Sequence, residues 1–219
     1  MGLQEKLDAF KANFEEKVAP PHVVEVLHRT TAELIATRQA ERALKAADQA
    51  PEFTLPDAEG RPVSSNELLK RGPLVITFYR GVWCPYCNID LKAIEAAADE
   101  IRSLGASLIA ISMQTAANSL KSQRNNKLSY PILTDFGGRV ADGFGIRFRL
   151  PDELVDTYKR FGTDLPVING EPSLTLPMPA RYVISQDGVI AYAEVNPDYT
   201  RRPDPVELMP TLRRLANRD

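Results

Sequence analysis

Residues 74–87 read LVITFYRGVWCPYC, and this stretch decides the fold. Its first six residues form a continuous apolar, β-branched and aromatic run, which predicts a strand buried on both faces. After Cys87 the apolar residues recur at helical spacing, and Gly105 is expected to end that helix. The two cysteines therefore lie where a buried strand gives way to a helix.

Cys84 is expected at the N-terminus of this helix, where unpaired N–H groups and the positive end of the dipole favour an anion. Pro85 suits the first helical position. This placement predicts a lowered pKa for the Cys84 thiol, and Arg80 adds to the effect if it folds back over the sulfur. Cys87 lies one turn further along and reaches back to Cys84. The pair therefore has the spacing of a nucleophile and its resolving thiol.

Two other interpretations of the cysteines are weaker. Buried cysteines can act simply as small hydrophobic residues, but Trp-Cys-Pro-Tyr-Cys between a strand and a helix, in a chain with two cysteines in all, favours redox chemistry. A zinc site would need four ligands, and the two histidines, His22 and His28, lie far upstream. We therefore expect no metal and no other cofactor.

The composition is that of an ordinary globular protein. The chain has 219 residues, of which 43% are hydrophobic and 26% charged. A net charge of −2 gives no reason to expect nucleic acid or an anionic membrane as partner. Residues 1–6 lack the apolar core of a signal peptide, and no apolar run approaches the roughly 20 residues of a membrane helix. We expect a cytoplasmic protein, in which a cysteine pair serves catalysis or redox sensing.

Residues 1–50 are expected to form an N-terminal helical arm, and residues 51–219 an α/β domain. Apolar residues at helical spacing predict one helix up to Pro20, and a second that starts near Val23 and continues to Gln49. Amphipathic helices of this length bury their apolar side against something. The arm is therefore interpreted as a packing or dimerisation element, a homodimer through these helices included, rather than as part of the catalytic machinery.

Strands that alternate with helices predict parallel, right-handed connections in the α/β domain. Its expected elements are short strands within 53–63, a short helix capped by Ser64 or Ser65, strands at 106–113 and 131–134 around a helix at 115–125, a turn and short helix at 135–143, a strand at 181–185, a hairpin turn at 186–188, a strand at 189–195 and a helix from Pro205 to Arg218.

Residues 146–175 are the least regular part of the chain. A helical pattern from Pro151 to Phe161 stands between Arg147-Phe148-Arg149 and two further prolines. We interpret this part as an insertion beside the active site. Arg147 and Arg149 then either supply positive charge to the site or belong to a solvated basic surface.

The chain resembles the peroxiredoxin branch of the thioredoxin fold, the alkyl hydroperoxide reductase/thiol-specific antioxidant (AhpC/TSA) type, over roughly residues 50–219. The stretches that carry the resemblance are Pro51–Asp57, Phe78–Gly81, Tyr182–Ile190 and Val195-Asn196. The resemblance implies a central mixed sheet flanked by helices. It also implies a hydroperoxide substrate attacked by Cys84, and a thioredoxin-like or glutathione-type reductant.

The sequence departs from this family at two positions. Peroxiredoxins usually carry a Thr or Ser three residues before the reactive cysteine, where this chain has Gly81. They also place an Arg just before the penultimate strand, where this chain has Pro179, the position of the cis-proline of a thioredoxin. Arg181 lies close by. Gly81, Pro179 and Arg181, together with Trp83 as a packing residue, are the expected lining of the substrate pocket.

The leading hypothesis is a thiol peroxidase that passes through a Cys84 sulfenic acid and a Cys84–Cys87 disulfide. Arg80, with Arg181 or Arg147, would stabilise the thiolate and the departing oxygen. Two alternatives remain open. One is a thioredoxin-like thiol-disulfide oxidoreductase that uses the same cysteines. The other is a redox sensor in which disulfide formation changes how the N-terminal arm packs.

Overall fold

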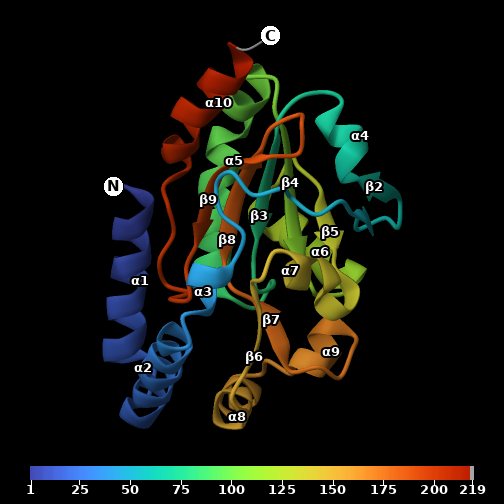
Figure 1. Cartoon of the computed structure of the whole chain (residues 1–219). Helices are drawn as coiled ribbons and strands as arrows, with labels where there is room; N and C mark the ends of the chain where they lie inside the picture. The colour runs from blue at the N-terminus through green and yellow to red at the C-terminus, as the bar shows by residue number, and fades with distance from the viewer. Residues whose placement is uncertain (218–219) are drawn as a thin grey trace.

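The computed structural model describes residues 1–217, with a five-stranded mixed sheet at the centre (Figure 1). In sheet order the strands are β5 (Ile132–Thr134), β4 (Ser107–Ser112), β3 (Leu74–Phe78), β8 (Ala180–Ile184) and β9 (Ile190–Val195). The pairs β3–β4 and β4–β5 are parallel, and β3–β8 and β8–β9 are antiparallel. The predicted thioredoxin-like α/β architecture is confirmed.

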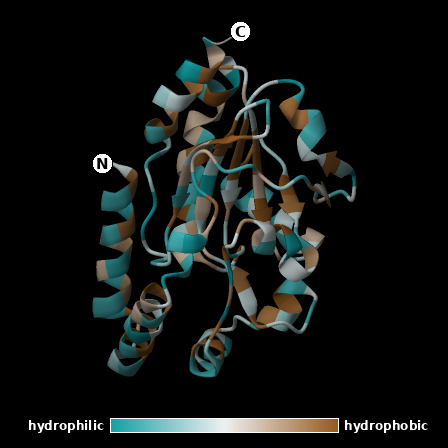
Figure 2. Ribbon diagram, in the orientation of Figure 1, coloured by the Kyte–Doolittle hydropathy of each residue, from teal (hydrophilic) through white to brown (hydrophobic). Residues whose placement is uncertain are grey.

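Strand β3 is buried on both faces, as its apolar run predicts. Figure 2 colours the strands at the centre of the sheet mostly as hydrophobic. Leu74, Ile76 and Phe78 pack into one hydrophobic cluster, whereas Val75 and the following residue Tyr79 pack into the other. Side chains of a strand alternate between its two faces, so this division is the one that the strand geometry requires. The two cysteines come shortly after this fully buried central strand in the chain.

Helix α5 (Pro85–Ser103) covers one face of the sheet and starts where the sequence predicts. Cys84 is its N-cap, and the Cys84 carbonyl accepts the Asn88 N–H at 3.1 Å. Beside α5 lie the turn η2 (Pro205–Leu208) and α10 (Met209–Ala216), which form the predicted C-terminal helix. The predicted last residue of that helix, Arg218, lies outside the described residues.

The N-terminal arm is built of α1 (Leu3–Lys17), α2 (Pro21–Ala36) and the single turn α3 (Gln39–Arg42). The prediction that the second helix continues to Gln49 is wrong. Arg38 adopts a left-handed conformation (φ 54°), and the chain beyond α3 runs alongside the β8–β9 hairpin. There Ala47 N–H donates to the Ile190 carbonyl and Ile190 N–H to the Asp48 carbonyl, both at 2.9 Å. Pairing with the sheet overrides the helical propensity of this segment.

The arm buries its apolar side against its own chain. Leu3 and Leu7 of α1 are part of the core beneath α5, and Phe10 stacks edge-on against Tyr86 with ring centroids 5.1 Å apart. Helix α2 packs on α8 (Asp152–Arg160), which belongs to the predicted insertion. Packing within the chain thus accounts for the apolar stripes, and a homodimer through these helices stays a prediction.

The remaining elements that agree with the predicted order are β1 (Thr54–Pro56), β2 (Pro62–Ser64), α4 (Ser65–Leu69), α6 (Ala116–Asn126), η1 (Phe136–Gly138) and α7 (Arg139–Gly143). Strand β6 (Arg147–Arg149), helix α9 (Leu165–Asn169) and strand β7 (Thr175–Pro177) were not predicted. Strands β6 and β7 form a ribbon that carries α8 and α9 below the sheet in Figure 1. Within residues 1–217, no helix has both the length and the apolar character that crossing a bilayer requires.

Candidate active site

Cys84 and Cys87 lie where β3 ends and α5 begins, and both are free thiols that are almost fully buried. Cys84 forms part of the wall of a pocket of about 200 Å³. Helices α1, α2 and α8 and the residue after α8 contribute aromatic and aliphatic side chains to that wall, namely Phe10, Phe14, Val23, Leu27, Tyr158 and Phe161. Cys87 is not part of this lining and lies deeper in the core. Cys84 is therefore the sulfur that a small molecule in the pocket meets.

The guanidinium of Arg80 is buried beside Cys84 and enclosed by three aromatic rings. Its Cζ atom lies 4.2 Å from the ring centroid of Tyr199, 4.7 Å from that of Trp83 and 5.2 Å from that of Tyr158. One Nη donates a hydrogen bond to the Tyr158 hydroxyl, whereas Nε has no hydrogen-bond partner among the described residues. Buried donors are rarely left unpaired, so this Nε is an exception in the site.

The pKa values of the two thiols differ from those that the sequence suggests. Burial raises the pKa of Cys84, and the hydrogen bond with Cys87 raises it further, more than the positive charges of Arg80 and Arg202 lower it. Burial also opposes ionisation of Cys87, but the hydrogen bond from Cys84 and the charges of Arg202 and Arg80 lower its pKa to about 6. The predicted lowered pKa of Cys84 is therefore wrong, and Cys87 is the thiol whose pKa is lowered.

A buried ionic cluster lies behind Cys87. Arg202 Nη2 donates to Cys87 Sγ at 3.6 Å, and Arg202 Nε lies 3.3 Å from Asp90 Oδ2. Asp90 Oδ1 accepts a hydrogen bond of 2.5 Å from Arg181 Nη2, and Arg181 Nη1 donates to the Pro203 carbonyl at 2.9 Å. Arg181 belongs to this cluster behind Cys87 and does not line the Cys84 pocket.

The loop between Arg80 and Cys84 needs a glycine at position 81. Gly81 has φ +147°, and a Cβ atom there would lie 2.6 Å from Trp83 Nε1 and 3.3 Å from Gln114 Oε1. The same Gln114 oxygen accepts the Val82 N–H at 2.8 Å, and its Nε2 donates to the Tyr79 hydroxyl at 2.7 Å. The family's hydroxyl residue therefore does not fit here while Trp83 occupies this position.

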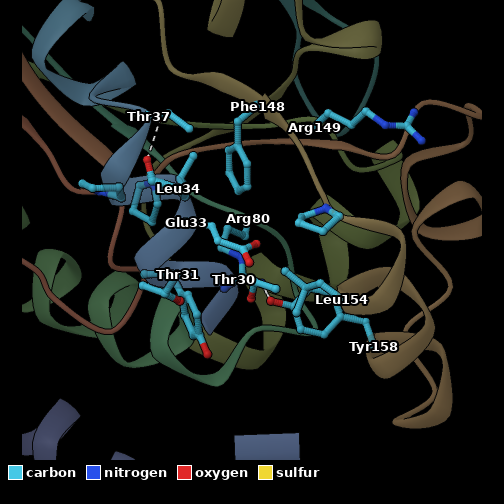
Figure 3. A pocket seen from close by; sticks show the side chains of 14 residues that line it. Thr30, Thr31, Glu33, Leu34, Thr37, Arg80, Phe148, Arg149, Leu154 and Tyr158 are labelled. Carbon is cyan, nitrogen blue, oxygen red and sulfur yellow. Dashed lines mark hydrogen bonds between the residues drawn. The ribbon is translucent and has the colours of Figure 1, made fainter. Parts of the chain in front are cut away.

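A second pocket, of about 140 Å³, lies against Arg80 (Figure 3). Arg80, Tyr158 and Tyr199 line both pockets and so separate them. Pro179 lines this second pocket and not the one that contains Cys84. No peptide bond within residues 1–217 is cis, so the comparison with the cis-proline of a thioredoxin does not hold for Pro179.

The two arginines of the insertion do not reach the cysteines. Arg147 pairs with Asp142 at 2.7 Å, and Arg149 pairs with Asp152 at 3.1 Å, its guanidinium pointing away from Arg80 in Figure 3. The insertion contributes Tyr158 instead, which confirms that it lies beside the site.

Sequence reasoning missed Asp90, Gln114, Tyr158, Tyr199 and Arg202. A signal for Asp90 was present, because it falls on the buried stripe of α5, between Cys87 and Leu91. A carboxylate on such a stripe requires a buried cation as partner. Nothing local identifies which arginine supplies it.

The fold and the cysteine pair at the strand–helix junction define a thioredoxin-fold protein with a dithiol centre. The AhpC/TSA family model matches residues 46–193, and the chain belongs to this family. The chain is 31% identical to peroxiredoxin Q of Oryza sativa over 65% of its own length and 55% of the relative's. It is 34% identical to the thiol-disulfide oxidoreductase ResA of Halalkalibacterium halodurans, over 49% and 61% of the two chains.

Among solved structures, peroxidoxin BcpB of Mycobacterium tuberculosis superimposes with a TM-score of 0.62. The match covers 78% of this chain and 98% of that one at 24% identity, which shows the shared fold.

Proposed function

We propose that this protein is a thiol peroxidase in which Cys84 reduces hydroperoxides. The observation that carries the proposal is the position of Cys84 at the N-terminus of α5, in the wall of a pocket that also contains the buried Arg80 guanidinium. Membership of the AhpC/TSA family and the likeness to peroxiredoxin Q support the same chemistry.

The reaction couples oxidation of two thiols to reduction of one peroxide. An S–O bond forms between Cys84 and the terminal oxygen as the O–O bond breaks, which gives a Cys84 sulfenic acid and an alcohol, or water from hydrogen peroxide. Cys87 thiolate then attacks the Cys84 sulfur, the S–S bond forms and hydroxide leaves. A thioredoxin-like dithiol, or two molecules of a glutathione-type thiol, returns the disulfide to two thiols by exchange and is itself oxidised to a disulfide.

Arg80 is the residue best placed to assist the first step. Its charge lies in a pocket with aromatic walls, where an electrostatic interaction is stronger than in water. The charge of this guanidinium would stabilise the oxygen that becomes negative as the O–O bond breaks. In this site a guanidinium would supply the stabilisation for which the family uses a hydroxyl residue at the position of Gly81.

Reduction of the disulfide requires movement, because both sulfurs are almost completely buried. We propose that the first turn of α5 opens to present Cys84 to the reductant. We also propose a cytoplasmic location and a homodimer through the N-terminal helices.

A thiol-disulfide oxidoreductase is the second candidate. The Cys-x-x-Cys spacing, the absence of a hydroxyl at position 81 and the likeness to ResA favour it. In that case the pocket beside Cys84 would receive part of a protein disulfide rather than a hydroperoxide.

The deciding experiment mixes reduced protein with one equivalent of hydrogen peroxide or an organic hydroperoxide and follows Trp83 fluorescence. Trp83 is the only tryptophan and lies in the same pocket as Cys84, so its emission reports the state of the site. We expect rapid formation of the Cys84–Cys87 disulfide, confirmed by intact mass. In Cys87→Ser we expect a Cys84 sulfenic acid that persists, and in Cys84→Ser no peroxide-dependent change.

An oxidation rate no higher than that of a free thiol would reject the peroxidase. Reduction of a model protein disulfide by the same preparation would then establish the oxidoreductase.

A further inference from the structure

The buried cluster behind Cys87 carries an unbalanced positive charge. Asp90 provides one negative charge, and Arg181 and Arg202 provide two positive charges, with all three side chains at most 4% exposed. Glu194, the cross-strand partner of Arg181 on β9, is partly buried and interacts with the Arg181 charge, and burial raises its pKa. Burying an uncompensated charge is costly, so an anion in contact with Arg202 stabilises the cluster. Cys87 Sγ, 3.6 Å from Arg202 Nη2, is that group.

Arg202 is fixed in this position from several directions. Its Nη1 donates to the carbonyls of Tyr199 and Arg201 at 2.8 and 2.6 Å, which leaves Nη2 directed at Cys87. Its backbone N–H donates to Gln4 Oε1 of α1 at 3.1 Å. A guanidinium held at this many points loses little further freedom when it binds a thiolate.

We propose that Arg202, oriented by Asp90, is a positioning residue that holds Cys87 as the thiolate of the reduced pair, so that Cys87 accepts the proton of Cys84 and then closes the disulfide. The part about disulfide closure rests on the proposed peroxidase function, whereas the part about ionisation does not.

The proposed reaction consumes two thiols and one peroxide. As Cys84 attacks the peroxide, its proton moves to Cys87 and ends on the departing alkoxide, so an alcohol leaves. Cys84 loses two electrons and the peroxide gains them. Cys87, again a thiolate beside Arg202, attacks Cys84, and the S–O bond breaks to release hydroxide. No reactant other than the two thiols and the peroxide is needed.

The groups that face Cys87 come from four parts of the chain. They are Cys84 on α5, Tyr79 and Arg80 after β3, Tyr158 on α8 and Arg202 in the loop after β9. Burial raises the pKa of both tyrosines, so they stay neutral near neutral pH. The ionisation of Cys87 therefore responds mainly to the two arginines and to Cys84.

The first test titrates the ultraviolet absorbance of the thiolate in Cys84→Ser, in which Cys87 is the single thiol. Adding Arg202→Gln is expected to raise the midpoint by at least about one pH unit, a tenfold loss of thiolate below it. Arg202→Lys keeps the positive charge but loses the planar set of N–H donors of the guanidinium, so it should give an intermediate midpoint. Arg201→Gln is the matched control, because Arg201 is exposed and pairs with Asp198. An unchanged midpoint in folded Arg202→Gln would overturn the proposal.

A measurement on the wild-type protein covers the case in which the Arg202 variants fail to fold. The Cβ chemical shifts of isotope-labelled cysteines report each thiol separately. We expect Cys87 to titrate before Cys84, and the opposite order would also overturn the proposal.

The second test is a single turnover with hydrogen peroxide followed by Trp83 fluorescence. Arg202→Gln is expected to slow the peroxide-independent closure step by on the order of tenfold, and Arg201→Gln to leave it unchanged. Closure at the wild-type rate would reject the role in disulfide formation. If the wild-type protein does not react with peroxide, the peroxidase function fails, while the titration still decides the ionisation state of Cys87.

Discussion

At the scale of single residues, the site depends on which of two neighbouring sulfurs bears the charge. A helix N-terminus favours a thiolate at Cys84, but burial without a direct cation contact outweighs this effect. Cys87 is just as buried, yet it has Arg202 in contact. The two thiols titrate as a coupled pair, and in the proposed mechanism Cys84 reacts with the peroxide while Cys87 carries the negative charge.

Gly81 is the residue where the chain departs most clearly from its family. We expect Gly81→Ala to destabilise the protein by about 1–3 kcal/mol, because φ +147° is strained for a side-chain-bearing residue and Trp83 must also move. Denaturant unfolding measures the loss, and Trp83 emission reports the displacement.

Gly60→Ala is the control for Gly81→Ala. Gly60 also has a positive φ of +84°, but a Cβ atom there meets nothing within 4 Å. The control should lose stability without a change in Trp83 emission. An equal emission change in both variants would show that the contact with Trp83 does not restrict position 81.

At the scale of elements, two of the contacts between the arm and the rest of the chain lie near the cysteines. Helix α1 supports α5, and its Gln4 side chain holds the loop that carries Arg202 through the Thr200 carbonyl and the Arg202 N–H. Helix α2 packs against α8, the source of Tyr158. Both helices therefore contact elements that carry residues of the site, which is the connection that a redox sensor would need. That third function stays a prediction.

Leu7→Ala tests how the arm contributes to stability. Leu7 is completely buried in the main core, so its truncation should cost about 2–5 kcal/mol in the free energy of unfolding. Ile35→Ala on α2 removes a side chain that is 49% exposed and should cost far less. If Leu7→Ala instead left unfolding unchanged and altered the oligomeric state, the arm would serve association between chains.

At the scale of the whole molecule, the cysteine pair couples stability to pH. The pKa of Cys87 is lowered from 9.0 to about 6 in the folded protein, so ionisation favours folding. This stabilisation is fully present above about pH 9 and is lost as the pH falls through 6. Cys84, whose pKa is raised, has the opposite effect only at higher pH.

The expected result is that the stability difference between reduced wild-type protein and Cys87→Ser grows as the pH rises from 6 to 9. Other buried titratable groups, such as Asp135, are common to both proteins and cancel in the difference. Chemical denaturation at a series of pH values under reducing conditions measures it. A difference that does not depend on pH would mean that Cys87 is a thiol in the folded protein.

The sequence by itself determined the sheet's central strand, the helix after it and the cysteines between them. These features are local: an apolar run, a proline at the first helical position and a change of period all lie within residues 74–101. The same locality misled the prediction for residues 37–49, whose helical composition yields to pairing with the β8–β9 hairpin.

Only the tertiary structure decided the surroundings of the sulfurs. Tyr158 forms a hydrogen bond with Arg80 although the two are 78 residues apart in the sequence, and Arg202 forms one with Cys87 across 115 residues. Arg181 stands close to the position that the family comparison suggests, but its charge is directed at Asp90. Charge interactions depend on distance and burial in space, so no pattern along the chain could state which guanidinium faces which sulfur.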